Sequence, residues 1–282
     1  MSTRIKSAAV AVVIAIVALI LHNTFVFNLI IGFISCVAVF EIFRATGMTQ
    51  HKWQSVACYS YTALVAILPA FYVHGWLFFF DSKLSMGLYI MAMCLLYLKE
   101  HDTFKYSDFF FMIGVTLLIP YSFGTIITMA GMGKVGVFLI VLTLCGAWLA
   151  DSGAYFAGTF FGKTKLCPNI SPKKTVEGLI GGVITNGILM LLISLIYGGL
   201  IGDEKLNYIW IFISGMLCAL IGLVGDLTAS VIKRQTGIKD YGNIMPGHGG
   251  VMDRFDSVLL VAPFMYYMIS QGLIVKDFLL SF

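Results

Sequence analysis

Long apolar runs separated by short polar stretches dominate the pattern of this chain. A helix needs about 20 predominantly apolar residues to cross a bilayer, and most of the runs approach or exceed that length. The pattern therefore predicts an all-α polytopic membrane protein. Its transmembrane helices should number about nine, at residues 7–21, 24–43, 55–73, 84–99, 108–129, 135–161, 176–198, 208–232 and 257–272.

The first apolar run follows Arg4 and Lys6, as in a secretory signal peptide. No small-x-small cleavage site follows the run, and His22-Asn23-Thr24 leads directly into the second one. We therefore expect residues 7–21 to be retained as the first span.

The distribution of Lys and Arg predicts the orientation, because cytoplasmic connections carry an excess of positive charge. With the N-terminus in the cytoplasm, the connections on that side hold fourteen of the eighteen basic residues, and the other side holds Lys83, Lys134, Lys205 and Lys276. The C-terminus is then on the opposite side. Residues 1–134 should form five spans, and residues 135–282 a catalytic transmembrane region whose loops 162–175 and 233–256 both face the cytoplasm.

Composition agrees with a membrane protein. Hydrophobic residues make up 59% of the 282 residues, charged residues only 11%, and the mean hydropathy is +0.94, which lies outside the range of soluble domains. The six cysteines are scattered, mostly within apolar runs, so we interpret them as small buried hydrophobic residues rather than as metal ligands or disulfide partners.

A few charged residues within the apolar runs call for an explanation. Asp151 lies well before the end of its run, so its carboxylate needs a cation or a hydrogen-bond donor inside the bundle. We interpret it as one wall of a polar cavity, with a structural buried polar group as the alternative. Glu41 and Arg44, three apart near a helix end, are interpreted as an interfacial ion pair, and no catalytic role is expected of residues 1–134.

Loop 162–175 leads into a predicted helix. We expect a turn at Ser171-Pro172, an N-cap at Thr175 and the acidic Glu177 in the first helical turn. A helix start preceded by lysines can bind phosphate through free backbone N–H groups and positive charge. The candidate ligand contacts in this loop are Ser171, Lys173 and Lys174.

The densest group of charged residues lies between residues 226 and 257. One face of the last turns of a span carries four polar residues at i, i+4, i+7 and i+8, namely Asp226, Ser230, Lys233 and Arg234. Two further carboxylates share a face at the start of the final helix. Because Mg²⁺ prefers one or two carboxylates together with water and phosphate oxygens, a hard-cation site is predicted from Asp226, Asp253 and Asp256.

Between these carboxylates, the turn Pro246-Gly247-His248-Gly249-Gly250 can present successive backbone N–H groups to an anion. A solvated loop with salt bridges is the alternative, but it accounts poorly for Asp226 before the end of an apolar run. Metal, cations and N–H groups are what phosphoryl or nucleotidyl transfer needs. The sequence contains neither a G-x-S-x-G motif nor a Walker A motif.

The charged stretch reads Ser230-x-x-Lys233-Arg234-x4-Lys239-Asp240-x-Gly242 and then Pro246-x-His248-Gly249-Gly250-x-x-Asp253-Arg254-x-Asp256. This sequence resembles the signature of the phosphatidate cytidylyltransferases, or CDP-diacylglycerol synthases. Met245 departs from the Leu, Ile or Phe usual before the proline, which is a volume-conserving change. Asp151-Ser-x-Ala-Tyr155-x-x-Gly158 and residues 170–178 also resemble family motifs, so the resemblance covers about two fifths of the chain.

The resemblance implies transfer of the CMP moiety of CTP to phosphatidic acid, giving CDP-diacylglycerol and pyrophosphate in phospholipid biosynthesis. Mg²⁺ is the implied cofactor, with a second metal ion as a further expectation. The metal ligands would be Asp226, Asp253 and Asp256, with Asp240 and Asp151 as additional candidates. The catalytic residues would be Asp226, Asp253, Lys233 and Arg234. The substrate contacts would be Ser171, Lys173, Lys174, Ser230, Lys239, His248, Gly249, Gly250 and Arg254.

The expected partners are CTP, phosphatidic acid and the lipid bilayer, with no nucleic acid; a homodimer is allowed, although no sequence pattern identifies its interface. The compact length favours a bacterial plasma (inner) membrane, with the active site facing the cytoplasm. Two alternatives stay open. One is a CTP-using enzyme on another lipid, such as an archaeol phosphate cytidylyltransferase or a polyprenol kinase, and the other is a transporter with Asp151 and Asp226 as coupling sites.

Overall fold

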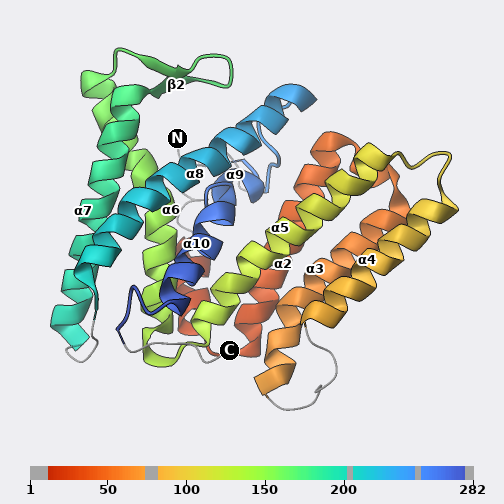
Figure 1. Cartoon of the computed structure of the whole chain (residues 1–282), viewed down its shortest axis with the longest axis horizontal. Coiled ribbons are helices and arrows are strands. Elements are labelled where there is room, and N and C mark those ends of the chain that lie inside the picture. The colour runs from red at the N-terminus through yellow and green to blue at the C-terminus, as the bar shows by residue number, and fades with distance from the viewer. Residues whose placement is uncertain (1–11, 74–81, 202–205, 245–248, 277–282) are drawn as a thin grey trace. The chain divides into compact units, whose positions relative to one another are not determined.

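The structure, a computed structural model, describes residues 12–73, 82–201, 206–244 and 249–276. These residues form two compact units, which we describe separately (Figure 1). The first unit extends to Gly131 and also contains Thr236–Arg254. The second contains Met132–Gln235 and the chain from Phe255 onwards. Part of the charged stretch therefore folds with the N-terminal helices, far away in the sequence.

The first unit is built on long helices that follow a helical segment at residues 12–20, and they are α2 (Phe25–Thr46), α3 (Lys52–Val73), α4 (Ser82–Lys99) and α5 (Tyr106–Ala130). Gly47 ends α2 with a left-handed φ of 77°, and a short 3-10 turn, η1 (Met48–Gln50), leads into α3. Helices α2, α3 and α5 pack on one another around buried side chains that include Phe43 and Phe123.

The second unit is built on α6 (Gly136–Phe161) and α7 (Val176–Ile201), which lie side by side, together with η2 (Gly133–Val135), α8 (Tyr208–Thr236) and α10 (Val258–Ser270) (Figure 1). Glycines allow the close approach of α6 and α7, since a side chain at Gly181 would collide with Ala157 and one at Gly153 with Thr185. The buried amide of Asn186 donates hydrogen bonds to the carbonyls of Gly146 (2.9 Å) and Gly215 (2.7 Å), and so ties α7 to α6 and α8.

A small β-hairpin interrupts the helical pattern between α6 and α7. Its antiparallel strands are β1 (Lys165–Cys167) and β2 (Ser171–Thr175). The turn occupies residues 168–170, so the prediction of a turn at Ser171-Pro172 is wrong: those residues begin the second strand. The backbone groups of loop 162–175 thereby find partners in a two-stranded ladder, which is one way for a short polar loop to satisfy them.

Five helices are long and apolar enough to cross a membrane, which confirms an integral membrane protein of the all-α class. They are Phe25–Thr46, Tyr106–Ala130, Gly133–Phe161, Val176–Leu200 and Tyr208–Thr236. Helices α3 and α4 form where spans were predicted but fall outside this group, and α10 has only 13 residues. The first predicted span lies partly outside the described residues. The predicted number of nine spans is therefore not confirmed.

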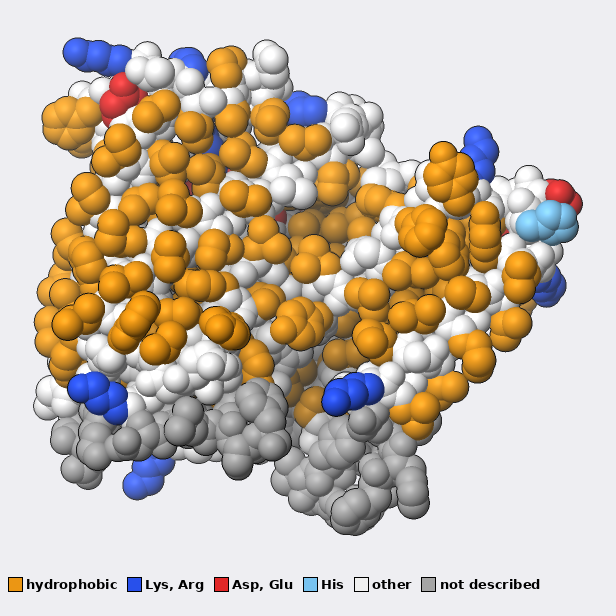
Figure 2. Space-filling model, in the orientation of Figure 1, with side chains coloured by type: hydrophobic (Ala, Val, Ile, Leu, Met, Phe, Trp, Pro, Cys, Tyr) orange, Lys and Arg blue, Asp and Glu red, His pale blue; other side chains and the backbone are white. Residues whose placement is uncertain are grey.

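Exposed apolar side chains cover the outer surfaces of the long helices. Figure 2 shows such side chains over much of the visible face, with Lys and Arg gathered towards the ends of the helices. On α7, the exposed residues recur every four positions, at Ile180, Ile184, Ile188 and Leu192. A stripe of this kind is expected where a helix faces hydrocarbon. All six cysteines are free, with Cys58 and Cys218 buried and Cys94 exposed.

Candidate active site

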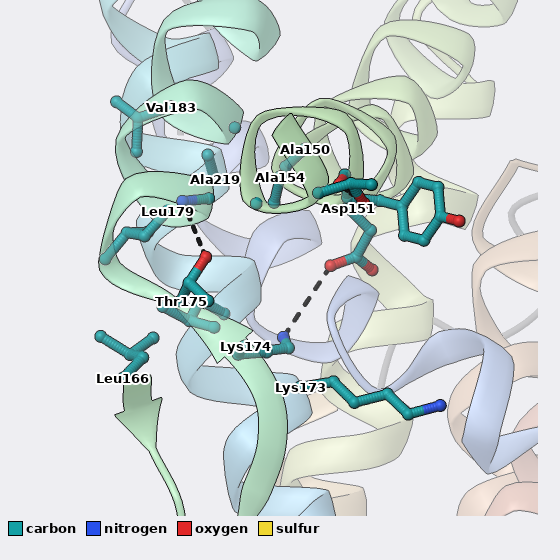
Figure 3. Close-up of a pocket in the computed structure, with 16 residues that line it drawn as sticks. Ala150, Asp151, Ala154, Leu166, Lys173, Lys174, Thr175, Leu179, Val183 and Ala219 are labelled. Atoms are coloured by element: carbon teal, nitrogen blue, oxygen red, sulfur yellow. Dashed lines mark hydrogen bonds and ion pairs between the residues drawn. The ribbon is translucent and has the colours of Figure 1, made fainter. Parts of the chain in front are cut away.

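Lys174 is the residue around which the polar groups of the second unit gather. Its ammonium contacts the carboxylate of Asp226 and lies 3.9 Å from Asp151 Oδ1, towards which it points in Figure 3. The lysine comes from β2, and the two carboxylates come from α8 and α6. Lys174 and Asp226 are 24% and 23% exposed, whereas Asp151 is 62% exposed. Shielding from water strengthens the Lys174–Asp226 pair. The structure thus brings together three predicted site residues from separate segments.

The local sequence fixes the position of Lys174. The hydroxyl of the next residue, Thr175, accepts a hydrogen bond from the Gly178 N–H at 3.1 Å, which confirms the predicted N-cap of α7. The carboxylate of Glu177 accepts hydrogen bonds from the backbone N–H groups of Lys163 and Thr164, both at 3.1 Å. The residues before the hairpin are thereby fastened to the first turn of α7, and Lys174, near the end of β2, is held next to the capped start of that helix.

Asp256 is a third carboxylate of this unit; it follows α9 (Met252–Phe255) in the chain, precedes α10 and is buried. It accepts a hydrogen bond from the Ser257 N–H at 2.7 Å. Burial raises the pKa of Asp256 to about 7, and the charge of Asp226 adds to this rise, while the Ser257 N–H and the charge of Lys233 oppose it. Carboxylates that repel one another in this way favour a cation placed among them.

Glycine allows α8 to approach this carboxylate closely. A side chain at Gly225 would meet the backbone of Asp256 and Ser257, and one at Gly222 would lie 3.5 Å from the Cβ of Ser257. The start of α10 therefore packs directly against the middle of α8. This contact brings Asp256 to the part of α8 that carries Asp226.

Two further residues of α8 stabilise the arrangement. The Ser230 hydroxyl lies 3.5 Å from Asp226 Oδ1, towards which it can donate a weak hydrogen bond. The guanidinium of Arg234 donates from Nε to the carbonyl of Ile170 at 3.3 Å, so the end of α8 holds the hairpin turn. In this contact Arg234 binds backbone, and its predicted role in binding phosphate stays a prediction.

A cavity of about 380 Å³ opens beside Lys174 and Asp151. Its walls come from α6, α7, α8 and the hairpin (Figure 3). Ala, Gly, Leu and Val line most of it, whereas its charged side chains are Asp151, Lys173 and Lys174. Lys173 extends away from Asp151 in Figure 3 and is exposed. Such a cavity suits a molecule with an anionic end and an apolar body.

In the first unit, carboxylates organise the glycine-rich loop. Asp253 Oδ2 accepts hydrogen bonds from the backbone N–H groups of Tyr241 (2.8 Å) and Gly250 (2.9 Å). Gly249 adopts a φ of 87°, which favours glycine. The Gly250 N–H that was expected to face an anionic ligand is therefore taken by a carboxylate of the same chain. His248 lies outside the described residues, while Lys239, Asp240 and Arg254 are exposed at the surface of this unit.

Sequence reasoning missed two residues of α2 that contact this loop. The carboxylate of Glu41, only 1% exposed, accepts hydrogen bonds from the N–H groups of Val251 and Met252, and Arg44 donates to the Tyr241 carbonyl at 2.6 Å. The interpretation of Glu41 and Arg44 as an interfacial ion pair is wrong, because both side chains are used to bind a loop about 200 residues away. The one sequence feature that could have pointed to Glu41 is that its carboxylate lies inside an apolar run.

The carboxylates of the second unit fit a hard cation by their chemistry. Asp226 already holds one cation, the Lys174 ammonium, and the charges of Asp151 and Asp226 both act on Asp256. Within the described residues, however, no three His, Cys, Asp or Glu side chains converge closely enough to enclose a metal ion as they stand. Asp253 belongs to the other unit. Joint metal binding by Asp226, Asp253 and Asp256 therefore stays a prediction.

The fold and site define an integral membrane protein with a lysine and carboxylates beside a largely apolar cavity. The sequence model of the cytidylyltransferase family matches residues 2–271, and the chain belongs to that family. It is 32% identical over 275 residues to the phosphatidate cytidylyltransferase of Bacillus subtilis, covering 96% of this chain and 98% of the relative. It is also 32% identical to the Haemophilus influenzae phosphatidate cytidylyltransferase, covering 94% and 96%, and 40% identical to that of Rickettsia felis, covering 61% and 75%.

Proposed function

We propose that this nucleotidyltransferase transfers the CMP moiety of CTP to phosphatidic acid, giving CDP-diacylglycerol and pyrophosphate. One observation carries the proposal: in a chain of the cytidylyltransferase family, a lysine paired with two carboxylates stands beside an apolar cavity in a membrane domain. The lysine can meet a phosphate, and the apolar walls can meet the hydrocarbon part of a lipid. A soluble phosphate acceptor would need neither the cavity walls nor the membrane.

The reaction needs charge neutralisation more than a strong base. An oxygen of the lipid phosphate attacks the α-phosphorus of CTP, a new P–O bond forms, and the bond to the β-phosphate breaks as pyrophosphate leaves. Both reactants are anions, so the chain must relieve their repulsion. Lys174 lies where it can bind a phosphate once its carboxylate partners hold another cation. Lys173 and Lys233 add positive charge on the hairpin and on the last turns of α8.

Mg²⁺ is the cation we propose for these carboxylates, with a second metal ion as an extension. When bound, it would neutralise the phosphates of CTP and polarise the reacting phosphorus. Asp226 and Asp256 would hold it, together with Asp253, and Asp240 and Asp151 are the remaining candidates. Basic, serine and glycine residues near these carboxylates in the sequence would hold the phosphates. As the family resemblance implies, they are Ser171, Lys173, Lys174, Ser230, Lys239, His248, Gly249, Gly250 and Arg254.

We further propose nine spans in a bacterial plasma (inner) membrane, with the N-terminus and the active site on the cytoplasmic side and the C-terminus outside. The excess of Lys and Arg in the cytoplasmic connections supports this orientation. CTP then reaches the site from the cytoplasm while the acyl chains stay in the leaflet. The homodimer stays a prediction, which a mass measurement of the protein in detergent would test.

Release of pyrophosphate from CTP on addition of phosphatidic acid tests the function directly. The purified protein should release it with phosphatidic acid and Mg²⁺, and the lipid product should carry CMP. An archaeol phosphate or a polyprenol offered in the same assay should be a poorer acceptor. Preference for either of those lipids would reassign the substrate, and absence of any CTP-dependent product, with solute uptake into proteoliposomes, would favour a transporter.

A further inference from the structure

We propose that Glu41 is a positioning residue of the reaction, whose buried carboxylate sets the conformation of the loop that carries Asp253. This inference rests on the proposed function, because it assigns that loop a part in catalysis. The residue lies on α2, in a part of the chain where the sequence indicates no chemistry.

The contacts of Glu41 reach the loop through backbone. Its Oε1 accepts a hydrogen bond from the Val251 N–H at 3.2 Å, and its Oε2 accepts one from the Met252 N–H at 2.8 Å. With 1% exposure, the carboxylate is withdrawn from water, so these N–H groups supply the polar partners that replace water. The two residues that follow Gly250 are thereby oriented by one side chain, immediately before Asp253.

The glycines of the loop are an independent observation. A Cβ on Gly242 or on Gly250 would collide with the carboxylate of Glu41, so the side chain fits only because both positions lack one. Both glycines belong to the stretch that resembles the family signature. Their lack of side chains is explained by the need to admit a carboxylate from α2, in addition to any conformational freedom that glycine gives.

The remaining contacts fix the other end of the loop. Arg44, one turn from Glu41 on α2, donates to the carbonyl of Tyr241, and Asp253 Oδ2 accepts the N–H of the same tyrosine. Tyr241 itself is 1% exposed. Two residues of α2 therefore bind the backbone of Tyr241 and of Val251 and Met252, which are described residues on either side of 245–248. Asp253 also joins these two sides by accepting from Tyr241 and Gly250. We call this set of contacts the α2 clasp.

Replacement of the carboxylate by an amide tests the clasp. Glu41→Gln keeps the shape of the side chain, but its NH₂ group must face one of two backbone N–H donors. Turnover of CTP with phosphatidic acid should fall about 10- to 100-fold in kcat, as when a positioning contact is misplaced. The KM for phosphatidic acid should change little. The matched control is Glu100→Gln, which removes a carboxylate bound to Gln54 in the same unit and should leave kcat within about twofold.

Hydrogen exchange gives a readout that does not depend on activity. Amides of residues 249–255 should exchange faster in detergent-purified full-length Glu41→Gln protein than in the parent, and the exchange of α5 should be unchanged. The Glu100→Gln protein should retain the protection of 249–255. Unaltered exchange in Glu41→Gln, or a kcat within about twofold of the parent, would overturn the proposal.

Gly250→Ala provides a second route to the same contact. Its methyl group should displace the Glu41 carboxylate and reduce kcat, and the double variant with Glu41→Gln should lose no more activity than the worse single variant, because both changes act on one contact. If the losses of kcat in the two single variants add up in the double variant, the proposal is wrong. It is also wrong if neither Gly250→Ala nor Glu41→Gln folds. If the parent enzyme is inactive on phosphatidic acid while amides 249–255 still exchange faster in Glu41→Gln, the proposed function is wrong, but the structural role of Glu41 stands.

Discussion

Lys174 is a cation shared by two carboxylates that differ in exposure. It contacts the largely buried Asp226 and lies near the exposed Asp151, at the side of a cavity lined mainly by apolar residues. An ammonium in this position could exchange one anion for another: if the proposed Mg²⁺ were bound by the carboxylates, the lysine would be free to bind a phosphate. Lys173, its neighbour, points elsewhere, as alternation along a strand requires.

Replacement of Lys174 should therefore be far more damaging than replacement of a lysine on the other strand. Lys174→Met should reduce kcat/KM for pyrophosphate release about 100-fold or more, the effect expected when a positioned charge at the reacting phosphates is lost. Lys165→Met, which removes an exposed lysine at the start of strand β1, is the control and should stay within about twofold. Equal activity of the two variants would remove Lys174 from the site.

The raised pKa of Asp256 predicts a pH dependence of metal binding. With a pKa of about 7, the Asp256 carboxyl is largely protonated below that pH and would have to lose its proton to bind the proposed Mg²⁺. The Mg²⁺ concentration for half-maximal activity should therefore rise as the pH falls from about 8 to about 6, by up to about tenfold per pH unit. Steady-state titration with Mg²⁺ at several pH values measures this.

Two variants decide whether Asp256 is the group responsible. In Asp256→Asn, the Mg²⁺ requirement should be higher at every pH and should lose most of its pH dependence. In Asp102→Asn, which removes an 85% exposed carboxylate, the parent behaviour should persist. A pH dependence that survives in Asp256→Asn would assign the proton to another group.

Single residues differ in how far the sequence could predict them. Asp151 and Asp226 stood out because a carboxylate inside an apolar run needs a partner, and Thr175 because a threonine before a helical run is a typical N-cap. The sequence did not identify Lys174 as the partner of both carboxylates, since that pairing depends on the hairpin. Glu41 was misread because its partners lie 210 and 211 residues away and are backbone groups, which have no sequence signature.

At the scale of elements, the packing of α6 against α7 shapes the cavity. Small residues on both helices line it, including Ala150, Ala154, Gly158, Gly178 and Gly182. Backbones that approach this closely bring Asp151 and the hairpin to the same place. The length of the apolar runs predicted the two helices to within about three residues. It could not predict which faces meet, because apolar residues occur all around both helices.

Enlarging a residue at the contact between α6 and α7 should reduce both stability and activity, because the two helices would be forced apart. Gly181→Val places methyl groups where the Ala157 Cβ lies, so α6 and α7 must move apart, at about 1–3 kcal/mol of stability. The thermal midpoint in detergent and the activity should both fall. Gly199→Val is the control, because Gly199 lies on the same helix as Gly181 and a Cβ there would meet nothing within 4 Å. An unchanged thermal midpoint for Gly181→Val would show that α6 and α7 do not pack closely at this position.

The hairpin was the element that the sequence failed to predict. Its strands have three and five residues and carry Lys, Pro and Ser, which have little preference for strands. The pairing is imposed by its surroundings: Glu177 binds the backbone at its start, Arg234 binds its turn, and the Thr175 cap fixes its end. Tertiary contacts of this kind override local propensity, so the loop appeared irregular in the sequence.

At the scale of the whole molecule, hydropathy predicted a membrane protein and the approximate place of each long helix. It could not establish the number of crossings, because α3, α4 and α10 fall short in length or apolarity. Nor could it predict that Thr236–Arg254 folds with the N-terminal helices, since such an association depends on contacts between distant segments.

The C-terminal segment bears on the ninth crossing. The start of α10 lies against Gly222 and Gly225 of α8, whereas at its far end the Asn207 N–H donates to the Ile274 carbonyl and Leu206 pairs with Val275. From Asn207, the residue before α8, to Gly225, the chain rises about 27 Å, close to the thickness of the hydrocarbon core. The chain from 257 to 275 thus runs back along most of α8, although only 13 of its residues are helical in α10.

This return path predicts that the C-terminus lies outside the cytoplasm. Alkaline phosphatase folds only where disulfides can form, so a fusion after Phe282 should be active in a bacterial host, and a green fluorescent protein fusion there should be dark. The same reporters inserted after Asn169, in the turn of the hairpin, should give the opposite result if that loop is cytoplasmic. An inactive phosphatase fusion at Phe282 would mean that the segment 257–275 does not cross, and the number of spans would then be even.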